Sequence, residues 1–290
     1  MPSLKDLKVR IKSVKSTQKI TKAMKVVAAA KLNRARQAAE SARPYATAME
    51  SMVTRLAAGT RGQSGLPVLL AGTGKDTVEL LVVVTADRGL SGAFNSSVVR
   101  AAKKRIRELQ AAGKTVKIYT VGRKGRDWLS GEFKSLILGS RIDVAKGTGY
   151  RMADDIAQEI FAAMRTQGLD RVTMVYNQFK SVISQVVTFQ QLMPLSVPEV
   201  ENPGAAASYE YEPSEEEILA DLLPRNFTMQ IFSALLENNA GFYGAQMNAM
   251  ENATKNAGEM IKKLTLKYNR TRQANITKEL IEIISGAEAI

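Results

Sequence analysis

Apolar side chains recur at alternating intervals of three and four residues along the amino-terminal segment. Thirteen of the sixteen positions in this register are apolar, and the repeat predicts a coiled-coil helix that begins with Ser3 as a cap and Asp6 three residues later. The register crosses Pro44 without a shift, so we expect a bend there and not a stop. The repeat positions are Leu4, Leu7, Ile11, Val14, Gln18, Thr21, Lys25, Ala28, Leu32, Ala35, Ala39, Ala42, Ala46, Met49, Val53 and Leu56.

The same spacing returns at the carboxyl-terminal end, where Thr254 is the single polar position of the repeat. A proline and a capping box within residues 213–217 predict the start of this second helix, and Gly286 predicts its end. Pro224 should bend its first turns. The repeat positions are Leu236, Ala240, Tyr243, Met247, Met250, Thr254, Ala257, Ile261, Leu264 and Tyr268.

Two helices of this length must pack against each other or against another chain, and an antiparallel pair is the simplest arrangement. At 1.5 Å per residue they would span about 82 Å and 108 Å, so about 17 residues of the second helix should extend beyond the first. That extension carries apolar residues on more than one face. We expect a surrounding partner to cover them; a tail folded back on its own chain is the alternative.

Between the helices, apolar runs alternate with amphipathic stretches, which indicates an α/β domain. The expected strands are 78–86, 115–121, 171–176 and 184–192, and the expected helices are 95–112 and 150–167. The fold class is therefore α/β plus all-α: a long antiparallel coiled-coil hairpin formed by the two chain ends, with an inserted Rossmann-like α/β domain. The expected divisions are an amino-terminal helix 1–58, a linker 59–74, the α/β domain 75–200, a linker 201–213 and a carboxyl-terminal helix 214–290.

The composition of the 290 residues, 45% hydrophobic and 24% charged, is that of a folded protein, and it includes neither cysteine nor histidine. The absence of cysteine excludes disulfides, thiol nucleophiles and Cys-ligated zinc, and favours an intracellular protein, although a disulfide-free exported protein stays open. The absence of histidine excludes Ser-His-Asp chemistry and most zinc hydrolysis. An enzyme would need carboxylates, lysine or a bound cofactor.

Charge is concentrated at the amino terminus. The net charge is +13, and residues 1–36 contain eleven basic residues and one acidic residue. This pattern is compatible with a solvated helix face, or with a polyanionic partner that is either nucleic acid or an acidic protein surface. No aromatic residue precedes Tyr45, which excludes base stacking by this segment but leaves duplex phosphate binding open.

No segment is a convincing membrane span, because the longest charge-free stretch, 181–198, contains polar residues and two prolines. The apolar run 26–30 is too short for a signal core, so we read the amino terminus as mature.

Two glycine-containing segments resemble phosphate loops only partly. Residues 72–75 follow no expected strand, and Leu69 stands where the Walker pattern needs its first glycine, so we expect a linker. Residues 87–92 follow a strand, but their glycines have GxxG spacing; we expect a tight structural turn, with a nucleotide site as the alternative. We assign no bound nucleotide.

Four stretches identify a family. Residues 16–24 (STQKITKAM), 87–92 (DRGLSG), 211–213 (YEP) and the tail, with ITKE at 276–279, Glu282 and GAEA at 286–289, resemble the gamma subunits of rotary F-type ATP synthases. The resemblance covers essentially the whole chain. It implies a rotor whose helical hairpin turns as a central shaft inside a ring of alternating α and β subunits, while the α/β domain lies towards the membrane ring.

The resemblance also implies roles for individual residues. The residues implied in coupling or in contact with the β subunit are Ser16, Gln18, Lys19, Thr21, Lys22, Met24, Lys25, Arg272 and Gln273. The apical bearing contains Ile276, Leu280, Ile283 and Ile284, and the foot near the membrane ring contains Tyr209, Tyr211 and Glu212. The polar repeat positions on the first helix weaken a simple two-helix interface, and we interpret them as shaped for β contact or for local adjustability.

By the same resemblance the chain is a non-catalytic subunit without a cofactor or metal of its own, and ATP, ADP and Mg²⁺ bind in the β and α subunits. The implied partners are the α and β subunits, the epsilon subunit (delta in mitochondrial naming) and the c-ring, with no nucleic acid. The implied location is the cytoplasmic face of a bacterial plasma (inner) membrane, as a peripheral protein.

The sequence departs from the family pattern at 241–244, where many relatives have a polar Ser-Glu step. Ser91 stands where cysteine is frequent, and the paired cysteines of the chloroplast insert are absent, which argues against thiol control. Two other classes stay open: a basic nucleic-acid-binding coiled coil, which would bind random DNA with a steep salt dependence, and an enzyme with a tightly bound dinucleotide.

Overall fold

The computed structural model describes residues 3–59, 66–144, 148–195 and 215–288. Two helices are far longer than the others: α1 spans Leu4–Gly59 and α6 spans Glu215–Glu288. The chain divides into two compact units, Ala30–Ala245 and the combination of Met1–Ala29 with Gln246–Ile290, and both helices contribute to both units. The second unit is called the paired segment.

The unit Ala30–Ala245 contains a five-stranded sheet in the order β3-β2-β1-β4-β5. The neighbours β1–β2, β1–β4 and β2–β3 are parallel, whereas β5 is antiparallel to β4. The strands are β1 Val78–Val84, β2 Thr115–Val121, β3 Ile137–Arg141, β4 Arg171–Phe179 and β5 Gln185–Met193. The shorter helices are α2 Val68–Ala71, α3 Phe94–Ala111, α4 Arg123–Phe133 and α5 Tyr150–Gln167, with a 3₁₀ turn at Lys134–Leu136.

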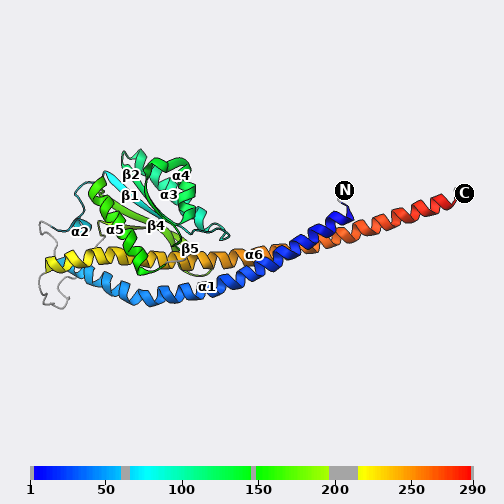
Figure 1. The fold of residues 1–290 in the computed structure, drawn as a ribbon, viewed down its shortest axis with the longest axis horizontal. Coiled ribbons are helices and arrows are strands. Elements are labelled where there is room, and N and C mark those ends of the chain that lie inside the picture. The colour runs from blue at the N-terminus through cyan, green and yellow to red at the C-terminus, as the bar shows by residue number, and fades with distance from the viewer. Residues whose placement is uncertain (1–2, 60–65, 145–147, 196–214, 289–290) are drawn as a thin grey trace. The chain divides into compact units, whose positions relative to one another are not determined.

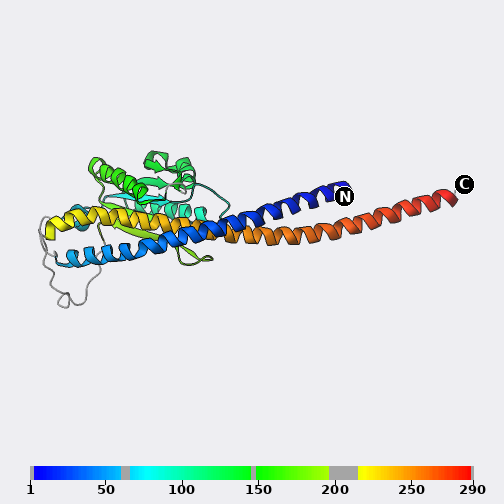
Figure 2. The ribbon, with the colours of Figure 1, turned by 60° about the horizontal axis from the view of Figure 1, so that its bottom comes forward.

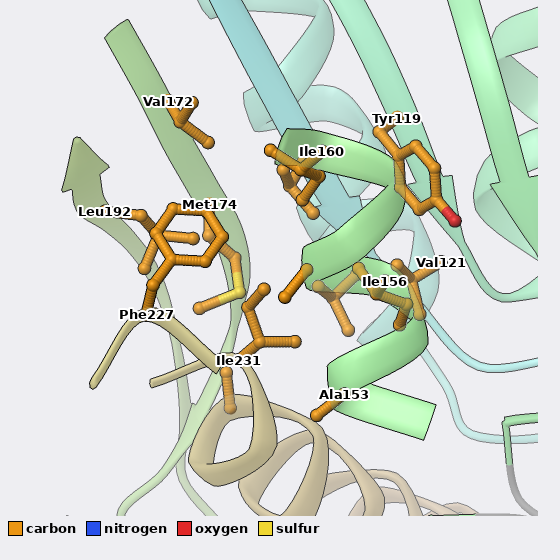
Figure 3. Close-up of a cluster of buried hydrophobic side chains, with 14 of the residues drawn as sticks. Tyr119, Val121, Ala153, Ile156, Ile160, Val172, Met174, Leu192, Phe227 and Ile231 are labelled. Carbon is orange, nitrogen blue, oxygen red and sulfur yellow. The ribbon is translucent and has the colours of Figure 1, made fainter. Parts of the chain in front are cut away.

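Helices cover both faces of the sheet (Figure 1). On one face, α3 and α4 bury Val98, Ile106 and Leu129 against β1 and β2. On the other face, α5 and the first part of α6 pack on β2, β1 and β4. Figure 3 shows Phe227 and Ile231 of α6 beside Met174, and Ile156 of α5 beside Val121, all within one buried cluster. The helix α6 is thus a core element of the α/β domain and not only a member of the helical hairpin.

Farther along this unit, α1 and α6 pack directly on each other and on α2. Met49, Val53 and Leu56 of α1 form one buried cluster with Leu219 and Leu223 of α6. The register predicted from the sequence is observed here, because every repeat position of α1 from Leu32 to Leu56 is buried or half-buried.

The paired segment consists of the first turns of α1 and the last part of α6, which run antiparallel. Its repeat positions, from Leu4 to Ala28 on α1 and from Met247 to Tyr268 on α6, are all buried or half-buried. The predicted cap is present: the Ser3 N–H donates to Asp6 Oδ2 at 3.2 Å, and the Asp6 N–H donates to Ser3 Oγ at 3.1 Å. Contact with Ser3 holds the pKa of Asp6 below its usual value.

The structure corrects two local expectations, confirms that the prolines do not stop the helices, and leaves part of the predicted capping box untested. Gly286 does not end the second helix, which continues to Glu288; a lone glycine costs only about 1 kcal/mol in a helix. The sequence pattern missed α2, α4 and β3. Both helices run through their prolines, Pro44 and Pro224, without a break in the assigned helix. Of the predicted capping box at 213–217, the first two residues lie outside the described residues.

Candidate functional site

The residues assigned to β contact on the first helix divide between two surfaces of the paired segment. Ser16, Lys19 and Lys22 are exposed on the outside of α1. Gln18, Thr21, Met24 and Lys25 are buried or half-buried towards α6. Arg272 and Gln273 are exposed on α6, just after the last half-buried position, Thr271. The predicted contact residues therefore comprise an exposed set on α1, an exposed pair on α6 and a polar layer between the two helices.

In the polar layer, the polar residues of the two apolar repeats contact each other. The hydroxyls of Thr21 and Thr254 are 2.7 Å apart, and Gln18 Nε2 donates to the Thr254 carbonyl oxygen at 3.4 Å. Lys25 forms an ion pair with Glu251 of α6. Gly258 makes room for the Gln18 amide, since a Cβ at that position would lie 3.0 Å from Gln18 Nε2.

The outer surface of α1 in this unit is strongly basic. Seven of its eight basic side chains make no ion pair with a described residue. Exposed pairs of this kind contribute about 0 to 1 kcal/mol each, so a partner surface would hold them by many weak contacts. These side chains are Lys5, Lys8, Arg10, Lys12, Lys15, Lys19 and Lys22.

Exposed apolar side chains lie among these cations, and the sequence reasoning did not assign them a role. Val9, Ile20, Val26 and Val27 are each more than half exposed. They fall between the positions of the three-four repeat, so a search for apolar residues outside the repeat could have found them. A surface that mixes lysine with aliphatic side chains suits a protein partner better than a phosphate backbone.

The carboxyl-terminal end of α6 extends past the start of α1 in both views (Figures 1 and 2). Every side chain from Arg272 to Ser285 is exposed. The residues predicted to form the apical bearing, Ile276, Leu280, Ile283 and Ile284, are 51%, 54%, 71% and 51% exposed, and Ile281 is 57% exposed on another face. Between Arg272 and Ser285 the tail does not fold back on its own chain. Full burial of each of these side chains would contribute about 1.5 to 3 kcal/mol.

The predicted foot residues Tyr209, Tyr211 and Glu212 lie outside the described residues. Among the described residues, no group of three His, Cys, Asp or Glu side chains is placed to hold a metal ion. In the same part of the chain, no helix is long and apolar enough to cross a membrane.

The segment 87–92 is a tight turn, as predicted. Leu90 and Gly92 have φ values of 63° and 58°, in the left-handed region. Asp87 Oδ1 accepts hydrogen bonds from the N–H groups of Arg123 and Asp143, each at 3.0 Å. The Asp87 carboxylate thus ties three loops together at the carboxyl ends of the strands.

The unusual glycines at 241–244 have a packing role. A Cβ on Gly241 would lie 3.1 Å from the Phe94 ring, and one on Gly244 would lie 3.3 Å from the Val182 carbonyl oxygen. Phe242 packs edge-on against Phe94, with ring centroids 5.9 Å apart. The small residues let α6 approach the α3 end of the domain closely, and a larger polar pair would need a shift of these neighbours.

Comparison with known proteins covers the whole chain. A family model described as ATP synthase matches residues 3–290. The ATP synthase gamma chain of Rhodopseudomonas palustris (strain TIE-1) is 59% identical over 291 residues, and that of Rhizobium etli (strain CIAT 652) is 58% identical over 294 residues. Each alignment covers 100% of both proteins.

Solved structures show the same architecture. A chain of the Tetrahymena thermophila mitochondrial ATP synthase central stalk and c-ring matches with a TM-score of 0.59 and 28% identity, covering 81% of this chain and 99% of that one. A chain of the Euglena gracilis mitochondrial ATP synthase matches with a TM-score of 0.67 over 99% of this chain and 94% of that one. At 21% identity the second match shows the fold alone. From the matched family model and the full-length relatives, the chain belongs to the ATP synthase gamma chain family.

Proposed function

We propose that the chain is the central-stalk rotor of a proton-translocating ATP synthase, coupling rotation of a membrane ring to conformational changes at catalytic sites in the β subunits. The observation that best supports this function is the exposed carboxyl-terminal end of α6. Its exposed residues from Arg272 onward extend about 25 Å as a helix and present aliphatic side chains on several faces. A ring that encloses the helix would cover all of these faces, whereas a flat surface would cover one.

The charge on α1 suits an acidic partner surface. The lysines at 5, 8, 12, 15, 19 and 22 recur at alternating intervals of three and four residues and follow one stripe of α1, while Arg10 lies elsewhere around the helix. Acidic segments of β that meet this stripe in turn as the shaft rotates fit the distribution, and weak individual contacts allow release.

The remaining assignments follow from the family. The α and β subunits form the ring, and the epsilon subunit and the c-ring bind nearer the membrane. ATP, ADP and Mg²⁺ bind in the β and α subunits, so this chain is non-catalytic. The assembly lies on the cytoplasmic face of a bacterial inner membrane. A basic nucleic-acid-binding coiled coil is not supported by the family comparisons, which match ATP synthase over the full length.

The test compares charge with the apolar tail in one assay of ATP synthesis by membrane vesicles. Replacing Lys15, Lys19 or Lys22 singly with Gln should change the rate less than twofold, because each exposed pair is weak. Deleting the chain from Ala274 onward should lower assembly or activity much more, because all contacts of the predicted bearing residues are lost at once. Immunoblots of the complex separate poor assembly from poor turnover. Single replacements more damaging than the deletion would require specific recognition of individual lysines.

A further inference from the structure

Between residues 39 and 46, α1 lies beside a polar cavity of about 250 Å³ that α6 and the strands β4 and β5 complete. The cavity exists because the repeat positions of α1 are alanines there, and Ala39, Ala42 and Ala46 all line it. In Figure 1 this stretch of α1 forms a shallow arch beside α6. The helix thus crosses a gap that its own repeat side chains do not fill.

On either side of the gap α1 is packed tightly. Before it, Leu32 is buried, and the Lys31 ammonium lies 5.5 Å from the centre of the Tyr243 ring. After it, Met49 and Val53 are buried in a cluster with the first turns of α6. The two ends of the stretch are therefore fixed, whereas the middle has room to move.

Pro44 stands within this stretch, on the exposed side of α1. Proline has no N–H, so the Glu40 carbonyl receives no helical hydrogen bond from position 44, and the proline ring needs room on its own side of the helix. Ala42 and Ala46 are each two residues away and point to the opposite side, because two residues turn a helix by about 200°. The helix therefore opens on its outer side and arches over the cavity.

The wall of the cavity opposite α1 can tolerate both the presence and the loss of water. Gln190 Nε2 donates to Gln230 Oε1 at 3.0 Å, and Gln230 Nε2 donates to Asn226 Oδ1 at 2.5 Å. Water in a polar gap hydrogen-bonds to such amides. When the water leaves, the amides keep their bonds to one another, so closing the gap does not leave them unpaired.

We propose that residues 39–46 of α1 are a flexible segment with two positions: an arched one, in which water fills the cavity, and a straighter one, in which the three alanines move into it. The packed ends at Leu32 and Met49 stay in place in both positions. In a rotating shaft this movement would take up strain between the two ends. That use rests on the rotor function proposed above, whereas the two positions of α1 do not.

Pulsed electron spin resonance on the full chain tests the proposal by measuring distances between two spin labels. The chain has no cysteine, so two introduced cysteines can be labelled selectively. Ala48→Cys lies on the outer side of α1 with Pro44, and Phe189→Cys lies on the face of β5 away from Gln190, so the label pair spans the cavity. We expect two distances that differ by about 3 Å, the width of one water molecule.

Two further changes to the labelled chain should shift these distances in opposite directions. Pro44→Ala restores the missing N–H and removes the ring, so it should straighten α1 and leave mainly the shorter distance. Ala42→Leu fills the cavity and should leave only the longer distance. The matched control Ala38→Leu, at an exposed position of the same helix, should change neither population.

Pro44→Ala favours the helix, so the test stays valid if Ala42→Leu folds poorly, which circular dichroism would reveal. A single distance in the labelled chain, or the same distances with and without Pro44→Ala, would overturn the proposal and leave a rigid, water-filled gap. These measurements do not depend on ATP synthesis, so either result would leave the rotor function untouched.

Discussion

At the residue scale, Gly122, which connects β2 to α4, has the least room for a side chain among the described glycines. Its φ of 93° is in the region that favours glycine, and a Cβ there would lie 2.2 Å from the Thr85 carbonyl oxygen. Backbone cannot move aside as a flexible side chain can. The position therefore admits no other residue without a shift of the β1 end.

We expect Gly122→Ala to lower the free energy of unfolding by about 3 kcal/mol or to prevent folding, since backbone strain adds to the collision. The control is Gly131→Ala within α4, where a Cβ would meet nothing within 4 Å. That change should stabilise by about 0.5 to 1 kcal/mol through helix propensity. Urea unfolding of both variants measures the difference, and similar stabilities would contradict the assignment of Gly122.

A second residue, Asp170, holds the start of β1 to the start of β4. The Thr73 hydroxyl donates to one of its oxygens, and the Thr77 hydroxyl and the N–H groups of Thr77 and Val78 donate to the other at 2.8, 2.9 and 3.0 Å. The Thr73 hydrogen bond first, then those from Thr77 and Val78, hold the pKa of Asp170 well below its usual range.

A carboxyl whose pKa is lowered by folding contributes stability above its unfolded pKa of about 3.9 and loses that contribution as the pH falls through the folded value. We therefore expect Asp170→Asn to be less stable than the unaltered chain at pH 7, with a difference that shrinks steadily below about pH 4. Asp221→Asn, at an exposed position of α6, should show no such trend. Urea titrations at neutral and acidic pH measure the difference in stability between each variant and the unaltered chain. A difference for Asp170→Asn that stays constant with pH would argue against this role of Asp170.

These residue-level features explain what the sequence could and could not predict. Repeat positions depend on spacing along one helix, so the seam from Leu4 to Leu56 was predictable. The helix α4 was missed because Gly125 and Gly131 weaken its pattern; Gly125 is needed because a Cβ would lie 2.8 Å from Thr85 Oγ1. That contact joins residues far apart in the sequence, and no local pattern reveals it.

At the scale of elements, the polar layer is where the two long helices depart from simple coiled-coil packing. The sequence marked Gln18, Thr21 and Lys25 as exceptions, but not their partners. Thr254 was visible as the polar position of the other repeat, whereas Glu251 lies outside that repeat and emerged only from the structure. The strand β3 was missed for another reason: it has only five residues, none of them is fully buried, and Gly139 interrupts the pattern.

Replacing Gln18, Thr21 and Lys25 together with Leu should tighten the helix pair and impair coupled turnover. The seam would gain about 1 kcal/mol per replaced residue, and Thr254 would keep its hydrogen bond to the Met250 carbonyl oxygen at 2.7 Å. Thermal unfolding measures the first effect and ATP-driven proton pumping the second.

The matched control is Thr17→Leu, at an exposed position of the same helix where the hydroxyl bonds only to Ser13 of its own helix. It should change neither quantity appreciably. Normal pumping by the triple variant in a fully assembled complex would show that the polar layer is not needed for coupling.

At the scale of the whole molecule, the purified chain should hydrolyse no ATP. The sequence has no histidine and no Walker loop, and in the described ranges no acidic cluster suited to Mg²⁺ is found. A phosphate-release assay on the isolated chain, beside the same chain carrying Asp87→Asn, checks this expectation. Turnover that copurifies with the chain and changes in the variant would contradict the non-catalytic assignment.

The continuity of α6 has a further consequence for how such a chain can change in evolution. One helix contributes Phe227 and Ile231 to a domain core, Thr254 to the polar layer and Ile276 to the exposed end. Because each residue turns a helix by about 100°, one inserted or deleted residue would rotate everything beyond it away from its contacts. Length variation should therefore collect in the connecting loops, while α6 admits only changes of whole heptads matched by α1.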